Sequence, residues 1–110
     1  MAATEFAAEV RHEDGVAVID LTGDVSSPAE QKLLEAYAQT EGEGVVRLDF
    51  SDVDYINSTG IALIVGLLGQ ARAARQEVEA RGLAEHYREI FRITRLSDFM
   101  TILDEEGDEA

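Results

Sequence analysis

The chain has 110 residues, with 23 acidic side chains against 9 basic ones and a formal net charge of −14. This length predicts one small domain with its own core, and a hydrophobic content of 45% is typical of a folded protein. A surface this acidic repels the phosphates of nucleic acids and of anionic membranes, so neither is expected as a direct partner. A basic partner, or one met through an apolar patch, fits the composition.

The chain has no cysteine, which excludes disulfides, thiolate metal sites and cysteine nucleophiles. The N-terminus lacks the pattern of a signal peptide, and the longest apolar stretch is about half of what a membrane-spanning helix needs. We therefore expect a soluble, cytoplasmic protein. Lys32 is the only lysine beside eight arginines, which also allows a halophilic source. Residues 105–110 cannot bury anything and are predicted to form a solvated acidic tail, which leaves residues 1–104 as the domain.

The first half of the chain predicts a hairpin followed by a helix. Residues 5–11 and 16–21 are β-prone runs around an Asp-Gly pair, with a turn over residues 12–15 and a loop over 23–26. Ser27 is expected to cap a helix, with Pro28 in its first position and Glu30 reaching back from the third. Apolar residues at helical spacing continue this helix as far as residues 41–44: Leu33, Leu34, Tyr37 and Ala38.

The second half predicts alternating strands and helices. A buried strand over residues 45–50 is followed by a polar turn at 54–61 and a helix from about 58 to 76. Residues 77–81 form a weak strand with Val78 and Ala80 inward, residues 84–94 form a helix that presents Tyr87, Ile90 and Phe91, and residues 99–103 form a last strand. The order β-β-α-β-α-β-α-β predicts an α/β fold of the α+β type, with a mixed, mostly parallel sheet faced by helices.

The central helix has three apolar sides. They are a bulky side of Ile61, Ile64, Val65 and Leu68, a side of small residues, Ala62, Gly66, Gly69 and Ala73, and a third side of Leu63 and Leu67. This pattern fits either near-total burial or an apolar strip of Leu63 and Leu67 left exposed for a partner. Glycine in a helix costs about 1 kcal/mol against alanine, so Gly66 and Gly69 favour a close backbone approach.

The residues that could perform catalysis are few. His12 lies in the expected hairpin turn and His86 on an amphipathic helix, and no nucleophile-elbow glycine pattern surrounds Ser58. No phosphate-binding glycine loop with its lysine is present. Three aspartates alternate along one strand and its exit and could attract a cation, but their spacing matches no metal loop: Asp49, Asp52 and Asp54. We therefore expect no enzyme, no metal and no cofactor.

Ser58 and Thr59 lie where the central helix is expected to begin, among backbone N–H groups with no helical partner. One interpretation is that they only cap the helix. The other comes from the surrounding segment, residues 48–62, which reads LDFSDVDYINSTGIA. It resembles the signature of the STAS domain, in particular of the bacterial anti-sigma factor antagonists: an apolar strand, a spacer, then Asp-Ser-Ser/Thr-Gly and an apolar helix. The likeness extends over most of the chain, from residues 21–24 to residues 95–99.

The resemblance implies a mixed sheet with helices packed on one side and a role in partner switching. In that family the antagonist binds an anti-sigma factor that is also a serine-protein kinase of the histidine-kinase-like ATPase type. The kinase phosphorylates the serine of the motif, and the antagonist then dissociates. By position the phosphoacceptor maps to Ser58, with Thr59 as second choice and otherwise mainly structural.

The same resemblance implies a partner-binding surface. It comprises Asp24, Ser26, Asn57, Ser58, Thr59, Gly60, Ile61, Leu63 and Leu67. Asn57 stands where the family most often has aspartate, Ser26 stands where members often carry an acid, and little chain follows the last strand. The alternative is a STAS domain that is never phosphorylated, as a scaffold in a stress-signalling assembly or in a lipid-transport ABC complex. The sequence leaves a homodimer open.

Overall fold

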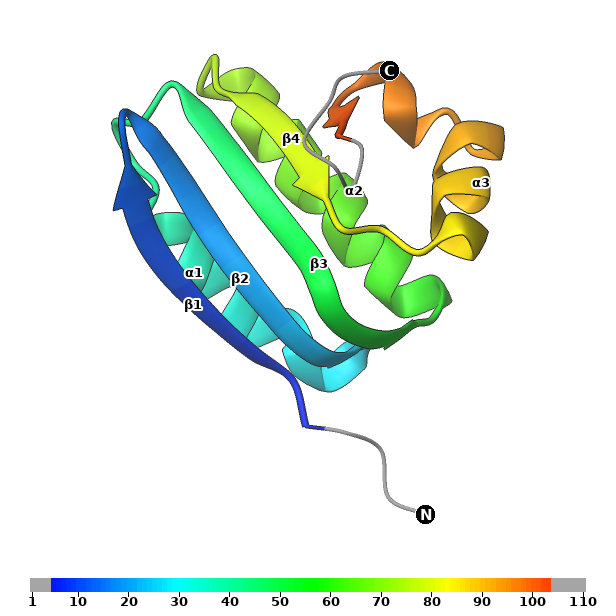
Figure 1. Cartoon of the computed structure of the whole chain (residues 1–110). Helices are drawn as coiled ribbons and strands as arrows, with labels where there is room; N and C mark the ends of the chain where they lie inside the picture. Colours follow the sequence, from blue (N-terminus) through cyan, green and yellow to red (C-terminus); the bar gives the residue numbers. More distant parts are fainter. Residues whose placement is uncertain (1–4, 104–110) are drawn as a thin grey trace.

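The structure is a computed structural model that describes residues 5–103, and the expected acidic tail lies outside them (Figure 1). One five-stranded sheet has the order β1-β2-β3-β4-β5, with β1 antiparallel to β2 and every other pair parallel. The elements are β1 (Ala7–Glu13), β2 (Val16–Val25), the 3₁₀ helix η1 (Ser27–Ala29), α1 (Glu30–Ala38), β3 (Val45–Ile56), α2 (Ser58–Ala73), β4 (Glu77–Arg81), α3 (Glu85–Ile93), the 3₁₀ helix η2 (Leu96–Asp98) and β5 (Thr101–Ile102). The predicted element order and mixed, mostly parallel sheet are confirmed.

The predicted hairpin is confirmed, with a tighter turn. Asp14 and Gly15 connect β1 to β2, and Glu13 pairs directly with Val16. Both turn residues have positive φ, 49° and 81°. Such a two-residue turn matches the right-handed twist of the strands that it joins, which explains the Asp-Gly pair. The hairpin places β1 at the outer edge of the sheet.

β2 and β3 run further than predicted, as far as Val25 and Ile56. The expected loop at 23–26 and the expected polar turn at 54–61 are therefore wrong for most of their length. The pairing between β2 and β3 shifts at two places, where β3 carries one extra residue. Such bulges turn a strand without ending it, and they break the alternation on which the prediction depended.

The expected cap by Ser27 is also wrong. Ser27 opens the 3₁₀ turn, and α1 begins at Glu30 without a side-chain cap. The two N–H groups that a Ser27 cap would serve already have backbone acceptors. The Ala29 N–H donates to the Ser26 carbonyl at 2.8 Å, and the Glu30 N–H donates to the Ser27 carbonyl. The backbone of the turn therefore supplies the acceptors for these N–H groups, and no side-chain cap is needed.

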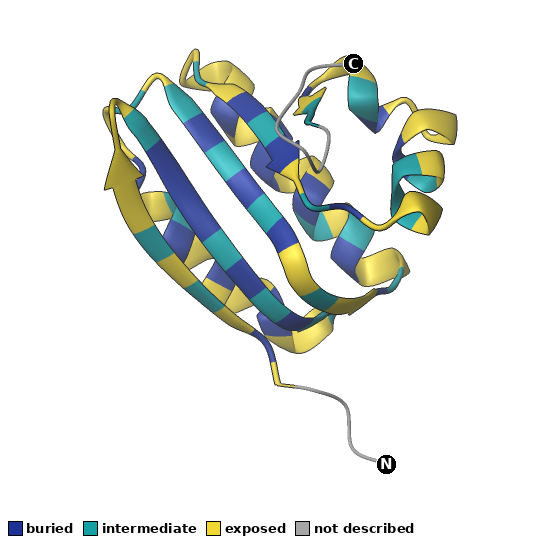
Figure 2. Ribbon diagram, viewed as in Figure 1, coloured by how far each residue is buried: buried dark blue, intermediate teal, exposed yellow. Residues whose placement is uncertain are grey.

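The core lies between the sheet and the helix layer. Figure 1 shows α1 and α2 behind the sheet and α3 beyond β4, and buried positions alternate with half-buried ones over residues 45–50, the first half of β3 (Figure 2). Ile19 and Leu48 from the strands and Ile64 from α2 are nearly fully buried. Phe91 of α3 joins the same core, with its ring edge-on to Phe50 at 6.1 Å between centroids. Helices on one side of the sheet are thereby confirmed.

The orientation of α2 overturns both interpretations of its three apolar sides. Leu67 is only 2% exposed and belongs to the core, and Leu63 is half-buried against it. The strip of Leu63 and Leu67 is therefore not exposed. The side of small residues faces solvent, together with Val65, so near-total burial is wrong as well. A Cβ built on Gly66 or Gly69 would meet nothing within 4 Å, so no close approach inside the chain explains these glycines.

α2 ends at Ala73, three residues before the predicted end, because Arg75 adopts a left-handed conformation and the Gln76 N–H donates back to the Ala71 carbonyl at 2.8 Å. Gln76 then takes another role. Its side-chain amide donates to the carbonyls of Thr40, at 3.0 Å, and Glu43, at 3.1 Å. The Tyr37 hydroxyl donates to the Gln76 Oε1 at 2.5 Å, and burial raises the pKa of Tyr37. This cluster joins α1 to the chain that leaves α2. In the remaining elements, the inward positions of Val78 and Ala80 on β4 are confirmed.

Candidate functional site

The carboxyl ends of β2 and β3 meet at one edge of the sheet. Asp24 pairs with Tyr55 and Val25 pairs with Ile56, and the Asn57 N–H then donates to the Val25 carbonyl at 3.2 Å. In α/β folds with parallel strands, binding sites lie beyond this end of the strands. We call residues 24–26 together with residues 54–60 the carboxyl edge. It contains the predicted site residues from both strands and the start of α2.

Asn57 is the residue that caps α2. Its backbone is extended, with φ −98° and ψ −175°, and its Oδ1 accepts from the Gly60 N–H at 2.8 Å. This is the geometry of an N-cap, and it needs only an acceptor oxygen, which asparagine and aspartate both supply. The interpretation that Ser58 and Thr59 cap the helix is wrong, because they occupy its first two positions.

Gly60 fixes how closely α2 approaches the sheet. A Cβ at this position would lie 2.0 Å from the Val25 carbonyl oxygen and 3.0 Å from Cγ2 of Ile56. No side chain fits there, so only glycine lets the first turn of α2 lie against the end of β2. Gly60 itself is buried. It therefore positions the exposed residues around it and offers no side chain to a partner.

Tyr87 of α3 holds the end of β3. Its hydroxyl accepts from the Ile56 N–H at 2.9 Å, so this backbone group is satisfied where the strand leaves the sheet. The His86 ring contacts the Tyr87 ring at 5.0 Å between centroids. The sequence indicated Tyr87 only as part of an apolar helix face, since nothing local connects residues 31 positions apart.

Ser58 and Thr59 are both exposed at the start of α2. Their N–H groups belong to the first turn, which has no intrahelical acceptors, and the helix dipole adds positive potential at this end. An accessible hydroxyl in this position can accept a phosphate that the helix terminus then stabilises. Among the described residues the Thr59 hydroxyl makes no hydrogen bond. The structure therefore gives Thr59 no structural role that would distinguish it from Ser58.

Tyr55 is the exposed residue at this edge that the sequence analysis missed. Its side chain is 53% exposed, whereas the neighbouring Ile56 is 5% exposed and faces the core. The second extra residue of β3 precedes this pair, so the alternation read from residues 45–50 no longer holds. The available signal was an aromatic residue directly before a polar helix start. Tyrosine in such a position is typical of a binding surface.

The other predicted partner residues lie in three different environments. Asp24, Ser26 and Asn57 are half-buried at the carboxyl edge, and Ile61, the first apolar residue of α2, is half-buried directly after it. Leu63 is also half-buried, one turn along the helix. Leu67 is a core residue, so its assignment to the partner surface is wrong: it shares the inward side of α2 with Ile64 and Ala71.

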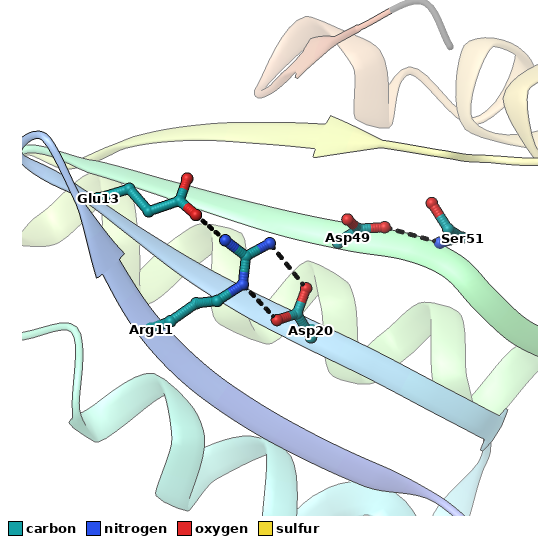
Figure 3. Close-up of polar contacts among 5 residues, drawn as sticks. All are labelled: Arg11, Glu13, Asp20, Asp49 and Ser51. Carbon is teal, nitrogen blue, oxygen red and sulfur yellow. Dashed lines mark hydrogen bonds and ion pairs between the residues drawn. The ribbon is translucent and has the colours of Figure 1, made fainter.

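His12 and Asp49 each contact a neighbouring group in the described part of the chain. His12 Nδ1 lies 2.8 Å from a Glu43 oxygen, beside the hairpin turn that precedes β2 and not at the carboxyl edge. Asp49 accepts from the Ser51 N–H at 2.9 Å (Figure 3). Within residues 5–103, no group of three or more His, Cys, Asp or Glu residues is placed to hold a metal. None of the described helices has the length and apolar character required to cross a membrane.

Comparisons with known proteins agree with this geometry. Residues 8–104 match the family model described as "Mlab, STAS domain". The anti-sigma-B factor antagonist of Listeria monocytogenes is 35% identical over 83 residues, which cover 76% of this chain and 72% of that protein.

Two solved structures show the same fold. An anti-sigma factor antagonist from Mycobacterium paratuberculosis superposes with a TM-score of 0.70 at 21% identity, covering 89% of this chain and 85% of that one. SpoIIAA of Bacillus, in its phosphorylated form, gives a TM-score of 0.69 at 17% identity, covering 91% and 94%. With the family match over nearly the whole described chain, these results show that the chain belongs to the STAS-domain family.

Proposed function

We propose that this chain is an anti-sigma factor antagonist, a non-enzymatic protein that binds an anti-sigma factor and is released when Ser58 is phosphorylated. One observation carries the proposal: Ser58 is exposed at the first position of α2, in a chain that is 35% identical to an anti-sigma-B factor antagonist. The partner would be a serine-protein kinase of the histidine-kinase-like ATPase type, acting in the cytoplasm.

The fold can accommodate a phosphate at Ser58. Phosphorylation adds a charge of about −1.5 to −2 and three acceptor oxygens. The first N–H groups of α2 and the helix dipole favour an anion at this position. Asn57 already holds the Gly60 N–H, so the cap does not depend on the Ser58 hydroxyl. We expect the phosphorylated chain to keep its fold.

The complex should not tolerate the same phosphate. Asp24 of β2 and Asp54 of β3 lie at the carboxyl edge with Ser58, so a partner that docks there already faces acidic side chains. Docking would require the phosphate to lose its hydration beside these carboxylates. A loss of about 1.4 kcal/mol lowers affinity tenfold, and an unpaired buried charge costs more than that.

The proposed contact surface differs from the expected one in three residues, one added and two removed. Gly60 is removed because it is buried and has no side chain. Asp24, Ser26, Asn57, Ser58 and Thr59 form its polar centre, with Ile61 and Leu63 beside it. Tyr55 is added, because an exposed aromatic side chain in a polar surface is the usual anchor of an interface. Leu67 is removed because it is buried.

Phosphorylation is the first test. The full chain is incubated with ATP and the histidine-kinase-like anti-sigma factors encoded in its own genome, and the modified residue is mapped by mass spectrometry. We expect phosphate on Ser58, no phosphate on Ser58→Ala, and normal labelling of Thr59→Ala, the matched control. Phosphate only on Thr59, or on a residue outside α2, would contradict the assignment.

Binding is the second test. Calorimetric titration of the kinase with Ser58→Glu should give an affinity at least about tenfold lower than that of the wild type. Ser58→Ala should bind as the wild type does but should not be released by ATP. Equal affinities for the three forms, or an unfolded Ser58→Glu variant, would count against the mechanism.

A second candidate function is favoured by one observation, the description of the matching family model as "Mlab, STAS domain". In this reading the chain is an unphosphorylated STAS subunit of a lipid-transport ABC complex. Co-purification with an ABC ATPase, unchanged by Ser58→Glu and with no phosphate on Ser58, would favour it over the antagonist.

A further inference from the structure

The outward face of α2 is a surface of a different kind from the rest of the molecule. We define it as the solvent-exposed residues of the helix beyond its first turn: Ala62, Val65, Gly66, Gly69, Gln70, Arg72 and Ala73. No acidic residue occurs between Asp54 and Glu77, although the chain has 23 acids in 110 residues. α2 thus carries a single charge, the positive charge of Arg72 near its end, in an acidic protein.

An apolar hollow lies beside this face. It has a volume of about 200 Å³ and lies between α2 and η2, lined by Val65, Leu68, Gly69, Arg72, Leu96 and Phe99. Val65 is 48% exposed and Phe99 is 53% exposed. Large apolar side chains gathered at one hollow are typical of a binding surface, whereas single exposed ones are ordinary.

The backbone of α2 is bare next to the hollow. Gly66 and Gly69 stand on the exposed side, and a Cβ on either would meet nothing within 4 Å. Each glycine costs about 1 kcal/mol of helix stability relative to alanine, and no contact in the described chain compensates for it. The distance between two packed helices depends on the side chains at their contact. A helix outside this chain could therefore approach α2 closely at these two positions.

The charges on this face indicate the chemistry of the partner. Arg11, Arg47 and Arg95 each form an ion pair with a carboxylate. Arg72 and Arg75 form none with any residue among 5–103. The Arg72 guanidinium instead lies over the Phe99 ring, 5.7 Å from its centroid. Arg72 on this face and Arg75 just beyond the end of α2, both without carboxylate partners among the described residues, complement an acidic segment.

We propose that the outward face of α2 is the docking site for an amphipathic helix of a partner protein. The apolar side of that helix packs on Gly66, Gly69 and the hollow, and its acidic side chains pair with Arg72 and Arg75. A helix fits better than a strand, because α2 offers no open hydrogen-bonding edge. The exposed stretch from Ala62 to Ala73 extends over about three turns, which suits anchors at helical spacing. The proposal does not depend on phosphorylation of Ser58.

The test uses two synthetic helical peptides with the same ridge of Leu and Ala, flanked by Glu in one and by Lys in the other. Each is titrated into the ¹⁵N-labelled full chain. We expect saturable binding of the Glu peptide, with shifts at residues 62–75 and Phe99, and binding of the Lys peptide weaker by at least about tenfold. No saturable binding of the Glu peptide, shifts confined to other elements, or equal binding of both peptides would overturn the proposal.

Matched variants separate the surface from the fold. Gly66→Gln with Gly69→Gln places two long side chains on the bare backbone and should reduce Glu-peptide binding at least about tenfold. Gly66→Ala with Gly69→Ala raises helix propensity similarly but adds only a methyl group at each position, so it should weaken binding less than the Gln pair does. Arg72→Gln with Arg75→Gln should remove the preference for the Glu peptide. Unchanged binding by the Gln pair would refute the docking site, as would a chain dimer in sedimentation that excludes the peptide.

Discussion

The two solvent-exposed faces of the molecule differ in how far their charged side chains form ion pairs within the chain. On the open face of the sheet, away from α1 and α2, Arg11 binds Asp20 and Glu13 (Figure 3). Arg47 of β3 pairs with Glu79 of β4 at 2.8 Å. The side-chain hydrogen bond to Asp20 raises the pKa of Arg11, and the charge of Asp49 adds to this. On the open face, Arg11 and Arg47 thus pair across neighbouring strands, whereas Arg81 at the end of β4 forms no ion pair among residues 5–103.

The outward face of α2 has no such ion pairs among the described residues. Arg72 on this face and Arg75 just beyond the end of α2 pair with no carboxylate among the described residues. Gly66 and Gly69 leave the helix backbone uncovered. This difference supports the proposal that the outward face of α2 docks a partner helix.

The largest expected effect comes from placing an aspartate on the buried side of α2 and, separately, on its exposed side. Leu67→Asp buries an unpaired carboxylate in the core and should cost about 4 kcal/mol or more, enough to unfold a small domain. Val65→Asp, the matched control two residues away, points to solvent and should change stability by less than about 1 kcal/mol. Thermal melting of both variants decides it. Similar melting temperatures would mean that α2 is rotated relative to the orientation described.

A second pair contrasts glycines that look alike in the sequence. Gly60→Ala would bring a Cβ to 2.0 Å from the Val25 carbonyl, and we expect a loss of about 1–3 kcal/mol from overpacking. Gly66→Ala meets nothing and should stabilise the helix by up to about 1 kcal/mol. Urea unfolding of the two variants should therefore show shifts of opposite sign. Destabilisation by Gly66→Ala would show that the outward face is covered within the chain.

The contrast between these glycines also shows where sequence analysis succeeds. Local signals predicted every strand and α-helix, though not η1 and η2, because a turn such as Asp14-Gly15 or a helix start after Asn57 is determined by adjacent residues. The resemblance to the STAS domain, and not a local signal, placed the end of β2 and the start of α2 in one candidate site. Tyr87 was not predicted as part of the site, because its contact with Ile56 joins residues far apart in the chain.

The orientation of α2 could not be chosen from apolar residues alone, because all three of its sides are apolar. The polar residues of the helix indicate its orientation. On a helical wheel, Ser58, Gln70 and Arg72 bracket the side of small residues, which predicts that side to face water. The lengths of β2 and β3 were underestimated for a different reason: the bulges of β3 interrupt the alternation by which a strand is recognised.

A smaller effect on stability is expected at the N-cap of α2. Asn57→Ala removes the acceptor of the Gly60 N–H and should cost about 1 kcal/mol. Asn57→Asp keeps the acceptor and adds a negative charge that the helix N-terminus favours, so its stability should equal or slightly exceed that of the wild type. Chemical unfolding at neutral pH measures both. A loss of stability in Asn57→Asp similar to that in Asn57→Ala would show that the cap geometry is wrong.

The smallest expected effect tests the open face itself. Arg47 and Glu79 pair across β3 and β4, with side chains 25% and 23% exposed. Their coupling, measured by a double-mutant cycle with Arg47→Met and Glu79→Gln, should be about 0.5 kcal/mol and should decrease as salt rises, because a partly exposed pair is screened. A coupling near zero at low salt would mean that this ion pair on the open face does not stabilise the fold. The contrast with α2 would then depend only on the uncovered helix backbone and its unpaired arginines.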